Sequence, residues 1–239
     1  MSHEIFTTQV VIPCYNEGPN LSKLISDCIS VSELSQNRVS FILVNNGSTD
    51  NTKEIFSQSG VERNRVTFLN LETNRGYGGG ILAGLSKCDA DFVGWTHADL
   101  QTPLTDILEA IKRQYVGDEF IKGSRVNREY GEQFFSTCMS IFESLLFGKK
   151  LREINAQPTI FPHSSLAFFD QAPLDFSLDL FAILIAKKAK MRIVRFDVEY
   201  LPRQFGASKW NFGFKSKLKF IIRTMKFSLQ LRWTFRANH

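Results

Sequence analysis

The chain has 239 residues, of which 43% are hydrophobic and 22% are charged. These values are typical of a globular protein, and they exclude intrinsic disorder, a collagen-like repeat and a small disulfide scaffold as descriptions of the whole chain. We expect no membrane-spanning helix, because no apolar run reaches the ~20 residues that one needs. We also expect no secretory signal, and we expect the four scattered cysteines to be reduced thiols of a cytosolic protein.

The charges are unevenly distributed along the chain. The whole sequence has a net charge of +5, yet nine of its 29 basic residues follow Glu199, where no Asp or Glu occurs. The rest of the chain therefore carries a net charge of −4. A one-sided basic end predicts an anionic partner, and lipid head groups, nucleic acid or a phosphorylated ligand would each satisfy it.

The first hundred residues alternate between strand and helix signals. Strands are expected over residues 8–13, 39–45, 66–70 and 91–96. Helices are expected from Leu21, after the NGSTDNT turn, over residues 80–86 and from Thr102-Pro103. This rhythm predicts an α/β fold, in which helices flank a mostly parallel central sheet and ligands bind at the carboxyl ends of the strands.

The second half of the chain has fewer regular signals. Helices are expected over residues 134–147 and 175–188, and a strand over residues 191–200. After these, apolar residues recur at three- and four-residue steps and form one stripe on a basic helix: Phe214, Leu218, Ile221, Ile222, Met225 and Leu229. Such a helix lies in a membrane interface or packs on the body of the protein, and both readings stay open. We therefore expect a domain over residues 1–211 and a basic amphipathic helix over residues 212–239.

Polar turns follow the predicted strands. The first turn carries Asn16 and Glu17, and the second carries Asn45 and Asn46 before Gly47. The third turn, NRGYGGG, is rich in glycine, which allows close backbone approach and leaves helix-start amides that favour anions. It also contains a GxGxxA match, but a dinucleotide-binding fingerprint would follow the first strand and not the third.

The fourth turn, HADLQ, has the chemistry of a metal motif. His97 and Asp99 flank one residue directly after a strand, and Gln101 lies just beyond them. A carboxylate at a strand end can hold a hard divalent cation that also bridges phosphates. We expect Trp95 to pack in the core beside this motif, and we expect His163 to be structural.

Six segments in order resemble the family 2 glycosyltransferases, and most of all the branch of polyprenyl-phosphate sugar transferases that includes dolichyl-phosphate mannose synthase. The pattern of that family is VIPxYNE, VDDGSxDxT, NxGxxxA, DADxQ, GSR and RxxGxSK. This chain has VIPCYNE, VNNGSTDNT, NRGYGGGILAG, HADLQ, GSR at residues 123–125 and RQFGASKW at residues 203–210. The order and approximate spacing are kept over about residues 9 to 210.

The resemblance implies the GT-A nucleotide-sugar-binding fold and a divalent metal, Mg²⁺ or Mn²⁺. It implies that Asp99 binds this metal, and we expect the imidazole of His97 to be the second protein ligand. The residues implied to hold the donor are Pro13, Tyr15, Asn16, Glu17, Asn46, Gly47, Gly76 and Asp99. The residues implied to face phosphates of the donor or the acceptor are Arg125, Arg203, Ser208 and Lys209.

Two departures from the family pattern remove negative charge from the expected donor site. His97 stands where the family has its first metal-motif Asp, and Asn45 and Asn46 stand where it has two acids. An imidazole ligand favours softer ions than Mg²⁺. One alternative is therefore a catalytically impaired relative that binds nucleotide or membrane.

A third departure concerns the catalytic base. Inverting transfer to a sugar hydroxyl needs a carboxylate to take the proton, yet Asn155 and Gln157 stand where many relatives have an Asp. A phosphate acceptor is already anionic, so these two side chains would only orient it. Asp175 and Asp179 are the fallback bases, on a helix expected to be solvated. The predicted catalytic residues are thus Asp99, Gln101, Asn155, Gln157 and Asp179.

The sequence therefore predicts an inverting, metal-dependent glycosyltransferase. It would move a sugar from a nucleoside diphosphate sugar to a polyprenyl phosphate at the cytoplasmic face of a membrane. It would attach there peripherally, through its basic end or through a membrane protein, and would bind no nucleic acid. The alternative enzyme would transfer the sugar to a sugar hydroxyl in cell-surface glycan synthesis.

Overall fold

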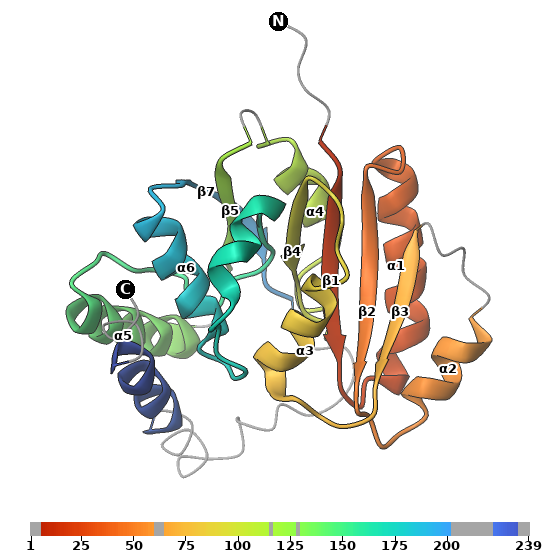
Figure 1. The fold of residues 1–239 in the computed structure, drawn as a ribbon, viewed down its shortest axis with the longest axis horizontal. Coiled ribbons are helices and arrows are strands. Elements are labelled where there is room, and N and C mark those ends of the chain that lie inside the picture. The colour runs from red at the N-terminus through yellow and green to blue at the C-terminus, as the bar shows by residue number, and fades with distance from the viewer. Residues whose placement is uncertain (1–5, 60–64, 115–116, 128–129, 202–221, 234–239) are drawn as a thin grey trace, which may run out of the picture.

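The computed structural model describes residues 6–59, 65–114, 117–127, 130–201 and 222–233. Its centre is a seven-stranded sheet with the strand order β3-β2-β1-β4-β6-β5-β7 (Figure 1). The strands are β1 Thr8–Cys14, β2 Val39–Asn46, β3 Val66–Leu71, β4 Phe92–Trp95, β5 Glu119–Val126, β6 Thr159–Pro162 and β7 Arg192–Glu199. Only β6 runs antiparallel to its neighbours among these strands, so the predicted mostly parallel sheet is confirmed.

Helices cover both faces of the sheet, which gives the three layers expected of an α/β fold (Figure 1). The helices are α1 Gly18–Leu34, α2 Thr52–Gln58, α3 Gly76–Leu85, α4 Asp106–Ile111, α5 Tyr130–Phe147, α6 Leu178–Lys188, the 3₁₀ helix η1 His163–Phe169 and a helix over residues 222–233. One hydrophobic core lies between the sheet and α1 and α4. The other lies between the sheet and α3 and α6, and it takes in Trp95 as expected.

Two strands and the starts of five helices differ from the sequence-based expectation: α1 begins at Gly18 and not at Leu21, α4 at Asp106 and not at Thr102, and α5 at Tyr130 and not at residue 134. The sequence did not indicate β5 or β6, because β6 has only four residues and β5 contains a lysine, Lys122, among its apolar residues. Helix α3 begins at Gly76 and not at Gly80, and α6 begins at Leu178 and not at Asp175. Glycine has a low helix propensity, so the start of α3 depends on tertiary contacts that the sequence does not display.

The ends of the parallel strands bring the predicted polar turns together. Cys14 at the end of β1 is in register with Asn45 near the end of β2, and Val11 is in register with Trp95 at the end of β4. The turns that follow these strands therefore share one edge of the sheet, at the bottom of the view in Figure 1. Ligands of parallel α/β sheets bind at this edge.

The C-terminal helix packs on the body with one face and exposes the other. Ser228 and Leu231 are buried, and the Ser228 hydroxyl donates a hydrogen bond to Glu143 Oε1 of α5 at 3.0 Å. Ile222 and Leu229, which belong to the predicted apolar stripe, are exposed. The remaining part of the stripe before Ile222, and the predicted boundary between residues 211 and 212, lie outside the described residues.

The pKa of Glu143 makes this contact sensitive to pH. Burial raises the pKa of Glu143 from 4.5 to about 7, and the hydrogen bond from Ser228 opposes this rise. A carboxyl whose pKa is higher in the folded state contributes stability below its unfolded pKa and loses it as the pH rises through the folded value. The wild-type protein should therefore lose stability from this group as the pH rises from 4.5 to about 7.

We predict that Glu143→Gln raises the free energy of unfolding at pH 8 by about 1–3 kcal/mol and changes it little at pH 5, because the amide cannot ionise. Urea unfolding at both pH values measures this difference. Glu54→Gln, at an exposed position of α2, is the matched control and should show no such pH dependence. An equal effect of Glu143→Gln at both pH values would contradict the prediction.

Candidate active site at the carboxyl edge of the sheet

Hydrogen bonds join the turns after β1 and β2 into one unit. Asn16, in the left-handed region with a φ of 58°, donates its backbone N–H to Ser48 Oγ at 3.0 Å and accepts at Oδ1 from the Thr49 N–H at 2.8 Å. The Gly18 N–H donates to Asp50 Oδ2 at 3.1 Å. Burial raises the pKa of Asp50, but hydrogen bonds from Thr52 and Gly18 outweigh it and lower the pKa below its ordinary value.

This unit presents the residues expected to bind the donor nucleoside. Tyr15 and Asn16 are exposed at the edge of the sheet, and Pro13 and Glu17 are half-buried beside them. Glu17 Oε2 accepts a hydrogen bond from Asn20 Nδ2 at 2.6 Å. The structure therefore brings these four predicted residues together at the edge.

Asn45 and Asn46 are buried, contrary to a role in direct contact with the donor. Asn46 donates from Nδ2 to the Gly76 carbonyl at 2.9 Å and accepts at Oδ1 from the Arg75 N–H at 3.0 Å. Asn45 donates to Asn70 Oδ1 at 2.7 Å and accepts from the Ser48 N–H at 3.0 Å. A carboxylate only accepts, so an acid at position 46 would lose the bond to the Gly76 carbonyl.

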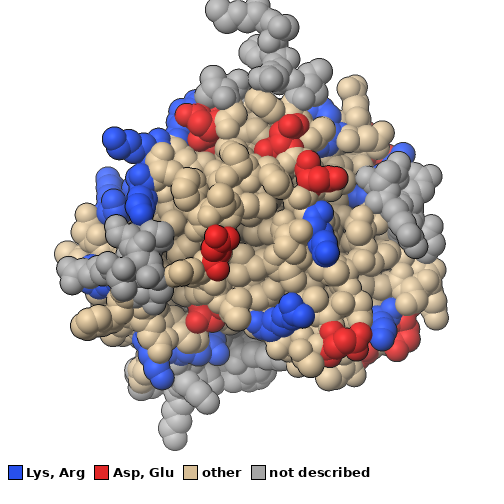
Figure 2. All heavy atoms as spheres, viewed as in Figure 1, with Lys and Arg blue, Asp and Glu red and all other residues tan. Residues whose placement is uncertain are grey.

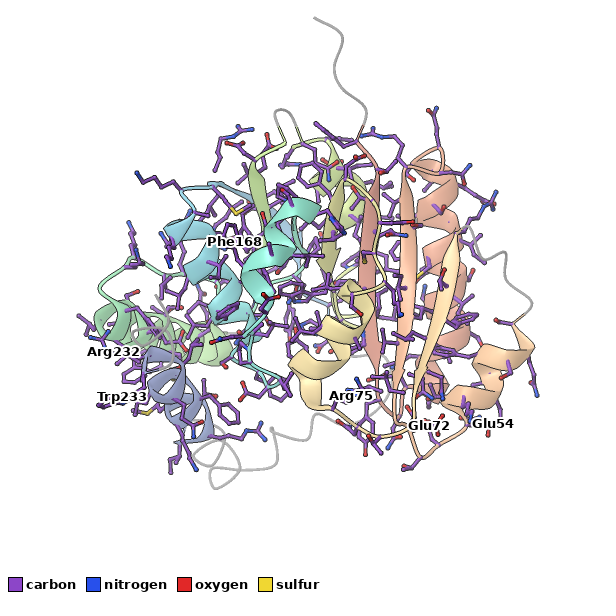
Figure 3. The ribbon with its side chains drawn as sticks, viewed as in Figure 1. Glu54, Glu72, Arg75, Phe168, Arg232 and Trp233 are labelled. Atoms are coloured by element: carbon purple, nitrogen blue, oxygen red, sulfur yellow. The ribbon has the colours of Figure 1, made fainter. Side chains whose placement is uncertain are left out.

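The glycines of the third turn let the backbone at Pro173 and Leu174 pack directly against the start of α3. A Cβ on Gly76 would lie 2.6 Å from the carbonyl oxygen of Leu174, and one on Gly78 would lie 2.3 Å from that of Pro173. The Gly79 N–H donates to the Leu174 carbonyl at 3.0 Å, and the Gly76 N–H donates to Asn74 Oδ1 at 2.8 Å. Two of the amides expected to favour anions are thus used inside the protein. Gly47 and Gly76 both have a positive φ, of 67° and 80°, which favours glycine in these turns. Figure 3 shows Arg75 at this end of α3.

The fourth turn lies directly after β4. His97 and Asp99 are half-buried, and Asp99 Oδ1 accepts a hydrogen bond from the Gln101 N–H at 3.3 Å. The Gln101 side chain donates to the Leu201 carbonyl at 3.2 Å, and the Leu201 N–H donates to the Gln101 carbonyl at 2.8 Å. Gln101 therefore holds the chain beside Asp99 just before the predicted phosphate-binding segment. The residues of that segment, Arg203, Ser208 and Lys209, lie outside the described residues.

The side chains at this turn fit a metal ion that a substrate also coordinates. His97 and Asp99 offer one imidazole and one carboxylate. The described part of the chain contains no group of three or more His, Cys, Asp or Glu side chains that could hold a metal by themselves. Hard divalent cations commonly complete their coordination with substrate phosphates. The residues therefore fit an ion bound jointly with a diphosphate.

Asp179 lies beneath this edge and is buried. The expectation that it lies on a solvated helix is therefore wrong. Its side chain is only 2% exposed, because the first turn of α6 faces the core. Its Oδ2 accepts from the Tyr77 hydroxyl at 3.0 Å. Its Oδ1 accepts from Gln157 Nε2 at 2.8 Å, Trp95 Nε1 at 3.2 Å and Lys122 Nζ at 3.3 Å. Both oxygens of this predicted base are thus occupied.

The neighbours of Asp179 complete a buried polar cluster, which we define as Tyr77, Trp95, Lys122, Gln157, Thr159 and Asp179. Lys122 Nζ donates to Thr159 Oγ1 at 2.7 Å, and Thr159 donates to Gln157 Oε1 at 3.0 Å. Gln157 is buried and bonded within the cluster, so it does not face an acceptor as predicted, whereas Asn155 is exposed. The sequence did not indicate Tyr77 or Lys122 as residues of the site, although a lysine inside an apolar strand is a signal of a buried charge.

Burial shifts the pKa values within the buried polar cluster. Burial raises the pKa of Tyr77 well above its ordinary value, and the neighbouring Asp179 carboxylate raises it further. Burial lowers the pKa of Lys122 to about 8, and Asp179 opposes this fall. Tyr77 is therefore a neutral donor to Asp179, and Lys122 supplies the compensating positive charge at neutral pH.

Arg125 is engaged within the protein. Its Nε donates to Glu153 Oε2 at 3.0 Å, and its guanidinium lies 5.7 Å from the centre of the Tyr200 ring. It stands at the end of β5, at the same edge of the sheet as the polar turns.

His163 is predicted to be structural. Its Nε2 atom lies 3.0 Å from the carbonyl oxygen of Cys88.

Comparison with known proteins assigns the chain to a family. The model of glycosyl transferase family 2 matches residues 9–176, so the chain belongs to this family. It is 25% identical over 210 residues to the undecaprenyl-phosphate 4-deoxy-4-formamido-L-arabinose transferase of Proteus mirabilis, covering 87% of this chain and 64% of that protein. The chain thus spans less than two thirds of the length of this relative.

Solved structures share the fold. Glucosyl-3-phosphoglycerate synthase from Mycobacterium tuberculosis, in complex with Mn²⁺, UDP and glucosyl-3-phosphoglycerate, has a TM-score of 0.70 at 16% identity, over 95% of this chain and 80% of that chain. The mannosyltransferase PcManGT from Pyrobaculum calidifontis, in complex with GDP-Man and Mn²⁺, has a TM-score of 0.62 at 19% identity, over 85% and 59%. The predicted GT-A fold is confirmed.

We predict that Asp179→Asn lowers the free energy of unfolding by ~3–5 kcal/mol, because it leaves the Lys122 charge buried without its partner. Adding Lys122→Met should recover part of this loss. Asp170→Asn, at an exposed position after η1, is the control and should be near neutral. Urea unfolding measures all four proteins. An inactive Asp179→Asn that is as stable as the control would instead indicate a catalytic base.

Proposed function

We propose that this protein is an inverting, metal-dependent glycosyltransferase that moves a sugar from a nucleoside diphosphate sugar to a polyprenyl phosphate. The observation that carries this proposal is the burial of Asp179 with both oxygens hydrogen-bonded. The other fallback base, Asp175, accepts at Oδ1 from the N–H and the hydroxyl of Ser177 at 2.8 and 2.6 Å. Asp179 is therefore withdrawn from a sugar hydroxyl at the edge, and Asp175 uses one oxygen within its own turn.

A phosphate acceptor makes such a base unnecessary. It is anionic at neutral pH, so its oxygen attacks the sugar without losing a proton first. The name of the Proteus mirabilis relative, an undecaprenyl-phosphate transferase, supports the same acceptor class. Exposed Asn155, and Arg203, Ser208 and Lys209 after the Gln101–Leu201 contact, are the residues we propose for the acceptor phosphate.

The donor is proposed to bind across the turns of β1, β2 and β4. Tyr15, Asn16 and Glu17 offer an exposed ring and polar groups for the nucleoside. His97 and Asp99 would hold Mg²⁺ or Mn²⁺, which supplies positive charge against the leaving diphosphate when it is bound. The structural neighbours that carry Mn²⁺ with UDP or GDP-Man support this class of cofactor.

The acceptor is a lipid, and two neighbouring helices offer an apolar surface for a membrane. Exposed apolar side chains on α5 recur at helical spacing: Phe134, Ile141 and Leu145. The helix over residues 222–233 adds Ile222, Leu229 and Trp233. We name these six residues the apolar face. Figure 3 shows Trp233 on the outside of that helix, beside α5.

The charge around the apolar face suits anionic lipid head groups. The helix over residues 222–233 contains Arg223, Lys226 and Arg232 and no acid. Figure 2 shows Lys and Arg side chains at the lower left, near this helix and α5. Apolar area and positive charge together favour binding to an anionic membrane interface. We therefore propose peripheral attachment at the cytoplasmic face of a membrane. None of the described helices is long and apolar enough to cross one.

We predict that UDP or GDP binds far more tightly with Mn²⁺ or Mg²⁺ than with EDTA, and that Asp99→Asn weakens the metal-dependent binding by ~10-fold or more. Isothermal titration measures the affinities, and a transfer assay with donor, metal and polyprenyl phosphate measures the product. Asp89→Asn, at an exposed position before β4, is the matched control. Equal affinities with metal and EDTA, together with no turnover, would indicate an impaired transferase.

We predict that Leu145→Glu weakens binding to anionic vesicles by ~10-fold or more, because it removes an exposed apolar side chain from the proposed lipid contact and adds a negative charge. Sedimentation with phosphatidylglycerol vesicles measures the bound fraction. Leu34→Glu is the matched control, since Leu34 is 64% exposed at the end of α1 and Leu145 is 80% exposed on α5. Equal losses in both variants would contradict a membrane contact at the apolar face.

A further inference from the structure

A row of ring contacts leads from the metal motif to the C-terminal helix. The ring centres of His97 and Tyr77 lie 5.8 Å apart with an interplanar angle of 35°. Tyr77 and Phe176 are stacked, with ring centres 4.9 Å apart and an angle of 11°. The Arg223 guanidinium, on the helix over residues 222–233, lies 5.4 Å from the centre of the Phe176 ring. We name these four residues the ring ladder.

The inner end of the ring ladder has a rigid anchor. The Tyr77 hydroxyl donates to Asp179 Oδ2 at 3.0 Å and lies 3.3 Å from Gln157 Nε2. The same carboxylate accepts from Trp95 Nε1, and Trp95 precedes His97 by two residues. One buried charge therefore holds both the strand that leads into the metal motif and the ring that packs against His97. Groups that orient a metal ligand influence how well the metal is bound.

Phe176, at the outer end of the ring ladder, is partly exposed and contacts the helix over residues 222–233. Phe176 is 48% exposed, and its ring contacts are with Tyr77 and with Arg223. Arg223 packs over it from a helix whose remaining contacts with the body include buried Ser228 and Leu231. A cation over an aromatic ring within about 6 Å is attracted to it. The position of Phe176 therefore depends on the C-terminal helix.

We propose that Tyr77 is a positioning residue that holds His97 through ring packing, and that Phe176 and Arg223 make this position depend on the C-terminal helix. The proposal rests on the proposed function, in which His97 binds the donor metal and that helix contacts the membrane. The helix would then tune the donor site without touching it.

Two matched pairs of variants test the ring ladder through nucleotide binding. Phe176→Leu should weaken metal-dependent binding of UDP or GDP by about three- to tenfold, less than the ~10–100-fold of a group bonded directly to a metal ligand, and should leave binding in EDTA unchanged. Phe168→Leu is the matched control, because the two side chains are almost equally exposed: Phe168, on η1, is 50% exposed and Phe176 is 48% exposed (Figure 3 labels Phe168). Equal affinities in these two variants would overturn the role of Phe176.

The second pair tests the link to the helix. Arg223→Gln should weaken the same metal-dependent binding by about twofold to fivefold, as expected for the loss of one cation–ring contact. Arg232→Gln removes the same charge from the same helix without touching Phe176, and it should leave the nucleotide affinity unchanged (Figure 3 labels Arg232). If both arginine variants bind nucleotide alike, the helix does not influence the site.

A spectroscopic measurement separates failure of the ring ladder from failure of the proposed function. The chain has four histidines, so a proton–carbon spectrum of its histidine side chains is simple to assign with a His97→Gln variant. Phe176→Leu should shift the His97 ring signals, because the Tyr77 ring would move, and Phe168→Leu should not. Absence of metal-dependent binding in the wild type would overturn the proposed function alone. An unshifted His97 signal in Phe176→Leu would overturn the ring ladder alone.

Discussion

The buried charge of Asp179 is the constraint on which the candidate site depends. A carboxylate withdrawn from water costs several kcal/mol unless a counter-charge and hydrogen bonds compensate it, and here Lys122 and three neutral donors do so. The strand register lines up the donors, because Trp95 is in register with Thr159, and Thr159 with Lys122. The charge thus fixes how β4, β6, β5, α3 and α6 meet beneath the metal motif.

The same constraint explains the chemistry of the edge above it. Asp179 is committed to the core and positions 45 and 46 carry amides, so none of these three positions adds a negative charge to the edge where a diphosphate and an anionic acceptor would meet. The side-chain amide of Asn46 both donates to and accepts from the backbone at the start of α3. Gly76 and Gly78 let the segment at Pro173 and Leu174 pack on that turn. The edge is therefore shaped by contacts between segments that are far apart in the chain.

The side of the molecule formed by α5 and the C-terminal helix is the one that we propose to bind the membrane. The contact between Ser228 and Glu143 holds the two helices together, and their exposed apolar side chains lie on the outside. The ring ladder connects this side with the metal motif through Phe176 and Tyr77. A soluble donor and a lipid acceptor would then bind on two sides of one molecule, and the packed rings of the ring ladder connect the donor side with the membrane side.

The sequence by itself determined the α/β class, the four strands β1 to β4, the polar turns at their ends and the family. These features depend on local periodicity and on short motifs, which a single sequence displays. The tertiary structure alone decided that Asp179 and Gln157 are buried, that the glycine turn packs against Leu174, and that Tyr77 touches His97. Each of these facts joins residues far apart in the chain, and local propensity carries no information about such partners. The burial of a charge, above all, is decided by the donors that the fold brings to it.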